Sequence, residues 1–267
     1  AVLDARARQP TVRRWREAPP VLPALPLARF EDSSVRGLLL RKLLLASCVP
    51  AQWLVPLDRL AGKRRKEYRQ FLITFAYWQG VRRAASPAQW DRVLHPPIIL
   101  MYHAIATAGE AASRYILPQD RFNLHLRWLR RLRRQVAPLA ALVKARRSGS
   151  LPPPRSVVVT FDDGYRDNIF HALPMLEKHN CTATAFLVTG SLGGANKWDA
   201  DGALAGRPLM SWEEARSAAA SGRLAFGGHT RGHPVLPSLD DAHLRDQLVQ
   251  CLADLQRELG PGSYPFA

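Results

Sequence analysis

A run of apolar, mostly β-branched residues ends abruptly in two carboxylates and a glycine: Val157-Val158-Val159-Thr160-Phe161-Asp162-Asp163-Gly164. Apolar runs that do not alternate with polar residues are typical of a strand buried on both faces of a parallel sheet. In such sheets functional groups gather beyond the carboxyl ends of the strands. Adjacent carboxylates repel each other, and a bound cation or a shared proton offsets that repulsion. A simple Asp-Asp-Gly turn is the alternative interpretation of these residues alone.

Two histidines separated by three residues, His229 and His233, follow farther along the chain. Gly232 and Pro234 disfavour a long helix, so the pair is predicted to lie on a loop or a short turn that brings both imidazoles to one side. Three intervening residues is also a known metal-ligand spacing. Together with a carboxylate at the end of a strand, the two imidazoles predict a three-ligand metal site with open positions.

These two stretches together are specific enough to suggest a family. Thr160–Gly164 followed by His229–Pro234 resembles the first two motifs of the NodB-homology polysaccharide deacetylases, carbohydrate esterase family four. Three more segments resemble that family in the same order. Pro97–His103 resembles the opening strand of its exopolysaccharide branch, Ala183–Val188 resembles its third strand, and Tyr264–Phe266 resembles the start of its third motif. The resemblance extends over about residues 96–267.

The resemblance implies an α/β fold, here a partial distorted (β/α)7 barrel. It implies a metal-dependent hydrolase that removes acetyl groups from N-acetylated or O-acetylated sugars of a polysaccharide or oligosaccharide. The implied metal ligands are Asp163, His229 and His233, the implied cofactor is a divalent metal, above all Zn²⁺, and the implied general base is Asp162.

The family's proton donor is a histidine in a late Leu-x-x-His motif that has no counterpart up to Ala267. The family's late tryptophan- and aspartate-bearing motif also lacks a counterpart, and Ala225 stands where many members carry an acidic residue. We therefore expect the domain to be C-terminally incomplete and the general acid to follow residue 267. A catalytically impaired carbohydrate-binding relic of the fold is the alternative that these departures leave open.

Charge divides the chain unevenly. The 267 residues carry 38 Lys+Arg and 22 Asp+Glu, but residues 1–150 hold 28 of the basic and 9 of the acidic ones. Such asymmetry indicates two environments. We predict a basic, mainly helical segment over residues 1–95 and the deacetylase-like domain over 96–267.

The basic segment contains a proline-rich stretch near Pro19–Pro26, a candidate amphipathic helix over Val35–Leu45, a basic cluster at Gly62–Lys66 and the aromatic run Phe71–Trp78. This pattern fits either peripheral membrane contact by a helix on an anionic surface or an ordinary helical domain with a solvated basic face. A basic membrane-surface binding protein is therefore a further alternative. No DNA-reading motif occurs, so no nucleic-acid partner is expected. Tyr77–Arg82 weakly resembles the tail of a family-two glycosyltransferase.

The cysteines and the apolar runs of the sequence predict where in the cell the protein lies. Its three cysteines are widely spaced, which fits a reducing compartment. No signal peptide is visible, and no apolar run approaches the roughly 20 residues of a membrane span. We expect a cytoplasmic protein or one peripheral to the cytoplasmic membrane, and we expect residues to precede Ala1.

Helical periodicity predicts two amphipathic helices in the second domain. One starts near Asp120, and its apolar face is predicted to carry Phe122, Leu126, Leu129 and Leu132 opposite a face of arginines. The other starts between Ser238 and Asp241, with a predicted core face of Leu244, Leu248, Leu252, Leu255 and Leu259. Ser211 and Glu214 are spaced as a capping box for a further helix.

Two residues on predicted loops have two interpretations each. His103 follows the first strand and either points into the site or is a structural histidine. Trp198, in a glycine-rich loop, either stacks on a sugar ring or packs on its own domain.

Overall fold

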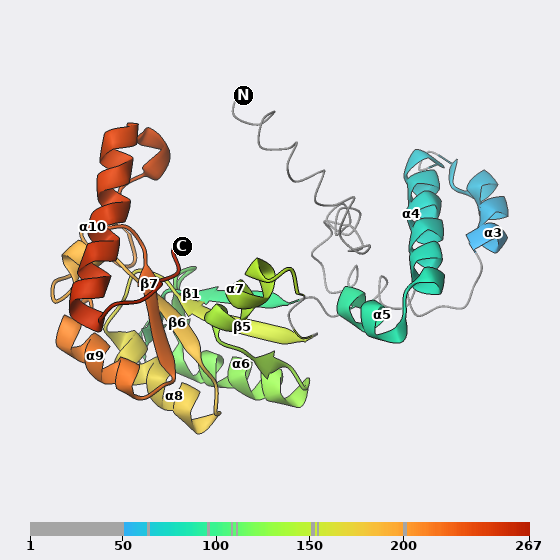
Figure 1. Cartoon of the computed structure of the whole chain (residues 1–267). Helices are drawn as coiled ribbons and strands as arrows, with labels where there is room; N and C mark the ends of the chain where they lie inside the picture. The colour runs from blue at the N-terminus through green and yellow to red at the C-terminus, as the bar shows by residue number, and fades with distance from the viewer. Residues whose placement is uncertain are drawn as a thin grey trace. The chain divides into compact units, whose positions relative to one another are not determined.

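The computed structural model describes residues 51–62, 65–94, 97–107, 109, 110, 112–150, 153, 155–199 and 202–267. The chain divides into two compact units, Ala1–Leu94 and His95–Ala267 (Figure 1). The predicted proline-rich stretch and the predicted helix over Val35–Leu45 lie outside the described residues, as do Lys63 and Arg64 of the basic cluster.

The described part of the first unit is helical. Its elements are α3 (Ala51–Leu54), the 3-10 turn η1 (Val55–Leu60), α4 (Arg65–Ala84) and α5 (Pro87–Leu94). Asp58 accepts hydrogen bonds from Arg65 Nε at 2.8 Å and Arg69 Nη2 at 3.0 Å, which ties η1 to the first turns of α4. These guanidinium groups hold the pKa of Asp58 below its usual value. Among the helices that the structure describes, none has both the length and the apolar character to cross a bilayer.

The second unit is built on a five-stranded sheet in which every pairing is parallel. Its main strands run in the order β1 (Ile98–Tyr102), β5 (Ser156–Phe161), β6 (Ala183–Leu187) and β7 (Leu224–Gly228), and β4 (Gln135–Val136) pairs with the first residues of β5. All six residues of β5 are buried, as an unbroken apolar run predicts for a central parallel strand. This confirms the predicted α/β fold with a parallel sheet.

Helices connect these strands and cover the sheet (Figure 1). They are α6 (Gln119–Arg131), α7 (Leu139–Arg147), the π-helical turn η3 (Asn168–Ala172) that runs into α8 (Leu173–Lys178), α9 (Trp212–Ala220) and α10 (Asp241–Leu259). The 3-10 turns η4 (Thr189–Ser191) and η5 (Leu236–Ser238) and the small β2 (Ala104–Ala106) and β3 (Ile116–Pro118) pair complete the unit. Ser211 and Glu214 form the predicted capping box at the start of α9.

The predicted apolar faces are partly wrong. In α10 the buried side chains are Cys251, Asp254 and Leu255, whereas Leu248 and Leu252 are exposed. The reason is a close approach between α10 and β7: a Cβ added at Gly228 would lie 2.8 Å from the Cys251 sulfur, so the smaller side chain faces the sheet. The N-cap of α10 is Asp240.

The end of α6 also departs from the prediction. Phe122 and Leu126 are buried against the sheet as predicted, but Leu132 lies just beyond the end of the helix and is exposed. Phe122 packs edge-on against Phe161 of β5 and against Tyr102 of β1, with ring centroids 5.6 and 5.3 Å away. These contacts fix α6 on the strand that leads to Asp162.

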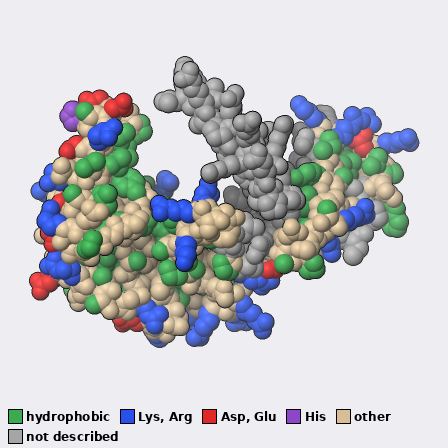
Figure 2. All heavy atoms as spheres, viewed as in Figure 1, with side chains coloured by type: hydrophobic (Ala, Val, Ile, Leu, Met, Phe, Trp, Pro, Cys, Tyr) green, Lys and Arg blue, Asp and Glu red, His purple; other side chains and the backbone are tan. Residues whose placement is uncertain are grey.

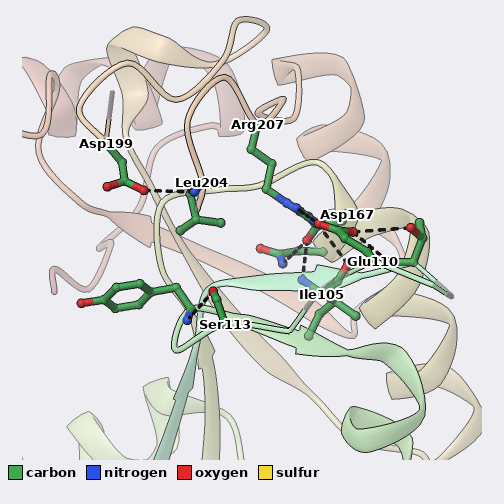
Figure 3. A network of polar contacts seen from close by, with 10 residues as sticks. Ile105, Glu110, Ser113, Asp167, Asp199, Leu204 and Arg207 are labelled. Carbon is green, nitrogen blue, oxygen red and sulfur yellow. Dashed lines mark hydrogen bonds and ion pairs between the residues drawn. The ribbon is translucent and has the colours of Figure 1, made fainter. Parts of the chain in front are cut away.

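A partly buried ion-pair network fixes the long loop between η4 and α9. Figure 3 shows Arg207 of this loop pointing at Asp167 and Glu110. Its Nε donates to Asp167 Oδ2 at 2.6 Å, and its terminal nitrogens donate to the Glu110 carboxylate. Asp167 Oδ1 in turn accepts the backbone N–H of Ile105 at 2.9 Å. The loop is thereby held against β2 and the residues that follow β5.

We expect Arg207→Met to lower the free energy of unfolding by about 3 kcal/mol, because it leaves the nearly buried Asp167 carboxylate without its cation. Denaturant unfolding followed by circular dichroism measures this. The matched control is Arg216→Met, which breaks a solvent-exposed pair with Glu258 and should cost less than about 1 kcal/mol. Equal losses in the two variants would contradict the structural role given to Arg207.

Candidate metal centre

The carboxyl ends of β5 and β7 bring the predicted site residues to one edge of the sheet. Asp162 and Asp163 follow β5 directly, and His229 follows β7, with β6 lying between these two strands. The backbone N–H of His229 donates to the Leu187 carbonyl at the end of β6 at 2.9 Å, which extends the sheet to the site. Parallel strand order therefore brings Asp162 and Asp163 close to His229, although these residues are far apart in the sequence.

Three of these side chains converge on one point. Nε2 of His229 lies 3.5 Å from Oδ1 of Asp163, and Nε2 of His233 lies 3.3 Å from the same oxygen. One ligand atom from each of the three residues lies within 4.8 Å of the others. The structure thus brings together the three residues that the sequence predicts as ligands.

The backbone at the site adopts the left-handed conformation, with positive φ angles, which residues other than glycine rarely adopt. Asp163, Thr230 and His233 all have positive φ angles, of 73°, 65° and 58°. Strain of this kind persists only where the surroundings enforce it, and it concentrates at functional sites. In the histidine loop the Thr230 hydroxyl accepts the backbone N–H of His233 at 2.9 Å, which closes the turn between the two imidazoles.

One oxygen of the buried Asp163 carboxylate has no hydrogen-bond donor. Its Oδ1 is buried and accepts no hydrogen bond from any described residue, and a buried acceptor in this state is costly. Burial would raise the pKa of Asp163, but His233, His103 and His229 outweigh it and hold this pKa below its usual value. The carboxylate is therefore kept ionised beside two imidazoles. A divalent cation that accepts one oxygen and two nitrogens fits this donor set.

The match to a known family covers this part of the chain. Residues 150–266 match the family model described as polysaccharide deacetylase, a range that contains β5, β7 and all four predicted site residues. Over this range the chain is similar to the polysaccharide deacetylases. The matched range and the deacetylase fold agree with the family that the sequence motifs suggested.

Individual polysaccharide deacetylases are similar in sequence to this chain over part of their length. YxkH of Bacillus subtilis, which is named as a polysaccharide deacetylase, is 33% identical over 95 residues, or 36% of this chain and 33% of the relative. The poly-beta-1,6-N-acetyl-D-glucosamine N-deacetylase of Staphylococcus epidermidis is 24% identical over 115 residues, or 43% of this chain and 39% of the relative. The chain thus spans a third to two fifths of the length of these relatives.

Among solved structures, IcaB from Ammonifex degensii superposes with a TM-score of 0.54 at 23% identity, over 64% of this chain and 73% of that one. A deacetylase of Streptococcus pyogenes, PplD in complex with acetate, gives a TM-score of 0.52 at 23% identity, over 63% and 71% of the two chains. These likenesses show that the second unit has the fold of NodB-type deacetylases.

The pKa of Asp162 shifts in the opposite direction to that of its neighbour Asp163. Asp162 is buried, and its backbone N–H donates to the Tyr102 carbonyl at 2.9 Å. Burial raises the pKa of Asp162 above its usual value, against the opposing charges of His229 and His103, and the Asp163 charge raises it further. A carboxyl group with a raised pKa is the better proton acceptor near neutral pH, whereas Asp163 stays ionised.

His103 follows β1 at the same edge of the sheet. Its charge acts to lower the pKa of both Asp162 and Asp163. Its ring packs against Tyr115, with centroids 5.0 Å apart, and its carbonyl accepts from Asn168 Nδ2 at 2.8 Å. These contacts fit a structural histidine, and a role of His103 in the site stays a prediction.

Trp198 packs on the site itself. Its ring is partly buried and stacks on His233 with centroids 4.7 Å apart and planes inclined by 22°. This contact supports the interpretation that Trp198 packs on its own domain. It also orients the imidazole of His233 toward Asp163.

The sequence did not single out Asn196 and Tyr165, which connect this loop to the site. Asn196 Oδ1 accepts the backbone N–H groups of Trp198 and Asp199 at 3.0 and 3.1 Å, and its Nδ2 donates to the Tyr165 hydroxyl at 2.7 Å. Burial and the charge of Asp163 raise the pKa of Tyr165 well above its usual value, so this hydroxyl stays protonated beside the carboxylate. Asparagine is common in turns, so the sequence of this glycine-rich loop does not distinguish Asn196 from an ordinary turn residue.

The hydrogen bond made by Nδ1 of His229 determines the tautomer of this histidine. Nδ1 lies 2.8 Å from the backbone oxygen of Ala267, and because this oxygen only accepts, Nδ1 is the donor. Nε2 of a neutral His229 therefore presents a lone pair toward Asp163. An oxygen behind the imidazole is the arrangement that orients histidine ligands in metal sites.

Helix α10 supports the histidine loop from behind. Oε1 of Gln247 accepts the backbone N–H of Gly232 at 2.8 Å and that of Arg231 at 3.2 Å. Two turns farther on, the buried Asp254 accepts the Thr189 hydroxyl at 3.0 Å and lies 3.5 Å from Nε of Arg231. One helix thus holds two of the three residues between His229 and His233, and we assign Gln247 as a positioning residue.

We expect Gln247→Leu to weaken zinc binding about tenfold, because it removes the acceptor that fixes the histidine loop. Titration calorimetry of the whole chain measures this. Gln247→Glu keeps an acceptor oxygen and should restore most of the affinity. The matched control is Gln256→Leu on the exposed side of α10. If Gln247→Leu binds zinc as tightly as this control does, Gln247 does not position the loop.

Proposed function

We propose that the chain is a metal-dependent hydrolase that removes acetyl groups from N-acetylated, or O-acetylated, sugars of a polysaccharide. One observation carries the proposal: within a polysaccharide deacetylase domain, an ionised and buried Asp163 oxygen without a hydrogen bond faces the Nε2 atoms of His229 and His233. Asp162, with its raised pKa, lies next to it.

Asp163, His229 and His233 would hold the metal. Two imidazoles and one carboxylate form the donor set of open zinc sites, so Zn²⁺ is the ion we propose. When bound in such a site, a zinc ion lowers the pKa of water to about 7 and polarises a carbonyl oxygen.

Each residue of the chain then has a separate task. Asp162 accepts the proton of the attacking water as the general base, and its buried position keeps bulk water from competing for that proton. Trp198 and Asn196 hold His233 and the loop above it in place. His103 is near enough to act on both carboxylates and is the candidate within this chain for returning a proton to the leaving group.

The proposed substrate class rests on the relatives. Those of Staphylococcus are named for poly-β-1,6-N-acetyl-D-glucosamine, so a polymer of N-acetylated hexosamine is the first substrate to test. A non-catalytic carbohydrate-binding domain is the second candidate, because Ala225 departs from the family pattern.

We expect Asp162→Asn to keep zinc binding but to lower the rate of deacetylation by on the order of 10²–10⁴, the size of a general-base effect. The measurement is acetate release from an N-acetylglucosamine oligomer, with zinc content determined in parallel. The matched control is Asp246→Asn, an exposed carboxylate of α10 that should leave both quantities unchanged. If Asp162→Asn loses the metal as well, the roles of the two aspartates are misassigned.

An activated aryl acetate separates the two candidate functions. Its leaving group departs without a proton, so it reports on the metal and Asp162 alone. Zinc-dependent hydrolysis of the aryl acetate supports the hydrolase proposal even where the oligomer reacts slowly. Sugar binding without any hydrolysis of either compound favours the binding domain.

A further inference from the structure

A long stretch of the deacetylase domain carries positive charge alone. Residues 121–155 contain ten Arg and Lys residues and no Asp or Glu. Eight of these cations are exposed: Arg121, Arg127, Arg130, Arg131, Arg133, Lys144, Arg146 and Arg147. None of the eight forms a salt bridge with a carboxylate that the structure describes.

Helix dipoles do not account for this number of cations. Five of them lie in the last turns of α6 and α7, where a cation complements the negative end of a helix. Each helix end carries only about half a negative charge. Two helix ends therefore balance about one of the eight cations, and the rest are unexplained by local structure.

Apart from Arg121 in the first turn of α6, these cations lie toward the edge of the sheet opposite to the metal centre. Arg133 precedes β4 and Arg147 lies on the helix that leads to β5, and both strands start at that edge. Burial and the charges of Arg130, Lys178 and Arg127 lower the pKa of His179, so cations of α6 and α8 lie on the same side. The six residues of β5 separate this edge from Asp162 by roughly 20 Å.

Two large apolar side chains are exposed among the arginines. Trp128 is 48% exposed and Leu132 is 57% exposed, one helical turn apart at the end of α6. The Arg131 guanidinium lies over the Trp128 ring, 5.4 Å from its centroid. Figure 2 shows basic side chains along the lower edge of the larger unit, where Figure 1 places α6 and α8.

We propose that this basic edge, defined by Arg127, Trp128, Arg130, Arg131 and Leu132, docks the deacetylase domain on an anionic lipid surface. Basic residues attract acidic headgroups, and a tryptophan with a leucine enters the interface between headgroups and acyl chains. A nucleic acid or another hydrophilic polyanion would match the cations but would leave Leu132 without a partner. Docked in this way, the domain turns the metal centre away from the membrane.

Binding of the whole chain to lipid vesicles tests this proposal. Vesicles of phosphatidylcholine with about one third phosphatidylglycerol are compared with neutral vesicles in a flotation assay. We expect binding only to the anionic vesicles. R127Q/R130Q/R131Q should lower the partition coefficient by on the order of 100-fold, about fivefold for each cation. W128A/L132A, which leaves the charge unchanged, should lower it several-fold.

The matched control removes the same charge from the first unit. R59Q/K66Q/R83Q changes three exposed cations of η1 and α4 and should keep binding within a few-fold of the parent. Unchanged circular dichroism melts confirm that each variant is folded. The proposal is overturned if the control loses as much binding as R127Q/R130Q/R131Q, because residues 1–95 would then make the contact. It is also overturned if W128A/L132A binds like the parent while duplex DNA competes for the protein, because a hydrophilic polyanion would then be the partner.

Discussion

The second unit depends on one buried carboxylate that has no hydrogen bond at Oδ1. Asp163 is 3% exposed and ionised, and the Nε2 atoms of two imidazoles lie 3.3 and 3.5 Å from that oxygen. In a protein interior such an arrangement is unfavourable unless a cation completes it. The positive φ angles of Asp163 and His233 show that the backbone enforces it. The elements around the site hold Asp163 and the two histidines in this unfavourable arrangement.

Three elements provide that support from different directions. The fully buried β5 delivers Asp163 and is locked by the aromatic contacts of Phe161. The loop anchored by Arg207 carries Trp198, whose ring stacks on His233. Helix α10 holds the histidine loop through Gln247 and Asp254. Because these contacts come from three separate segments, the geometry does not depend on metal binding alone, and a preorganised site results.

The sequence predicted the candidate ligands but not the residues that support them. The spacing of His229 and His233 and the carboxylate pair after a buried strand predict a three-ligand site, and the family resemblance implies Asp163 as its carboxylate. Gln247 was missed because a glutamine in an amphipathic helix resembles any other polar residue of its solvent-facing side. The leucine periodicity of α10 gave the wrong buried face, since the close approach at Gly228 selects Cys251 rather than Leu248. Such contacts depend on which elements meet in space, and periodicity within one helix does not contain that information.

Metal binding by the histidine pair is tested most directly by zinc titration calorimetry of the whole chain and of two histidine variants. His233 faces Asp163, whereas His243 is an exposed histidine that pairs with Asp240 at the start of α10. We expect one zinc ion per chain in the parent, the same affinity in His243→Ala, and at least a hundredfold weaker binding in His233→Ala, since a three-residue site loses one of its ligands. Zinc binding by His233→Ala with the affinity of the parent would contradict the assignment of this site.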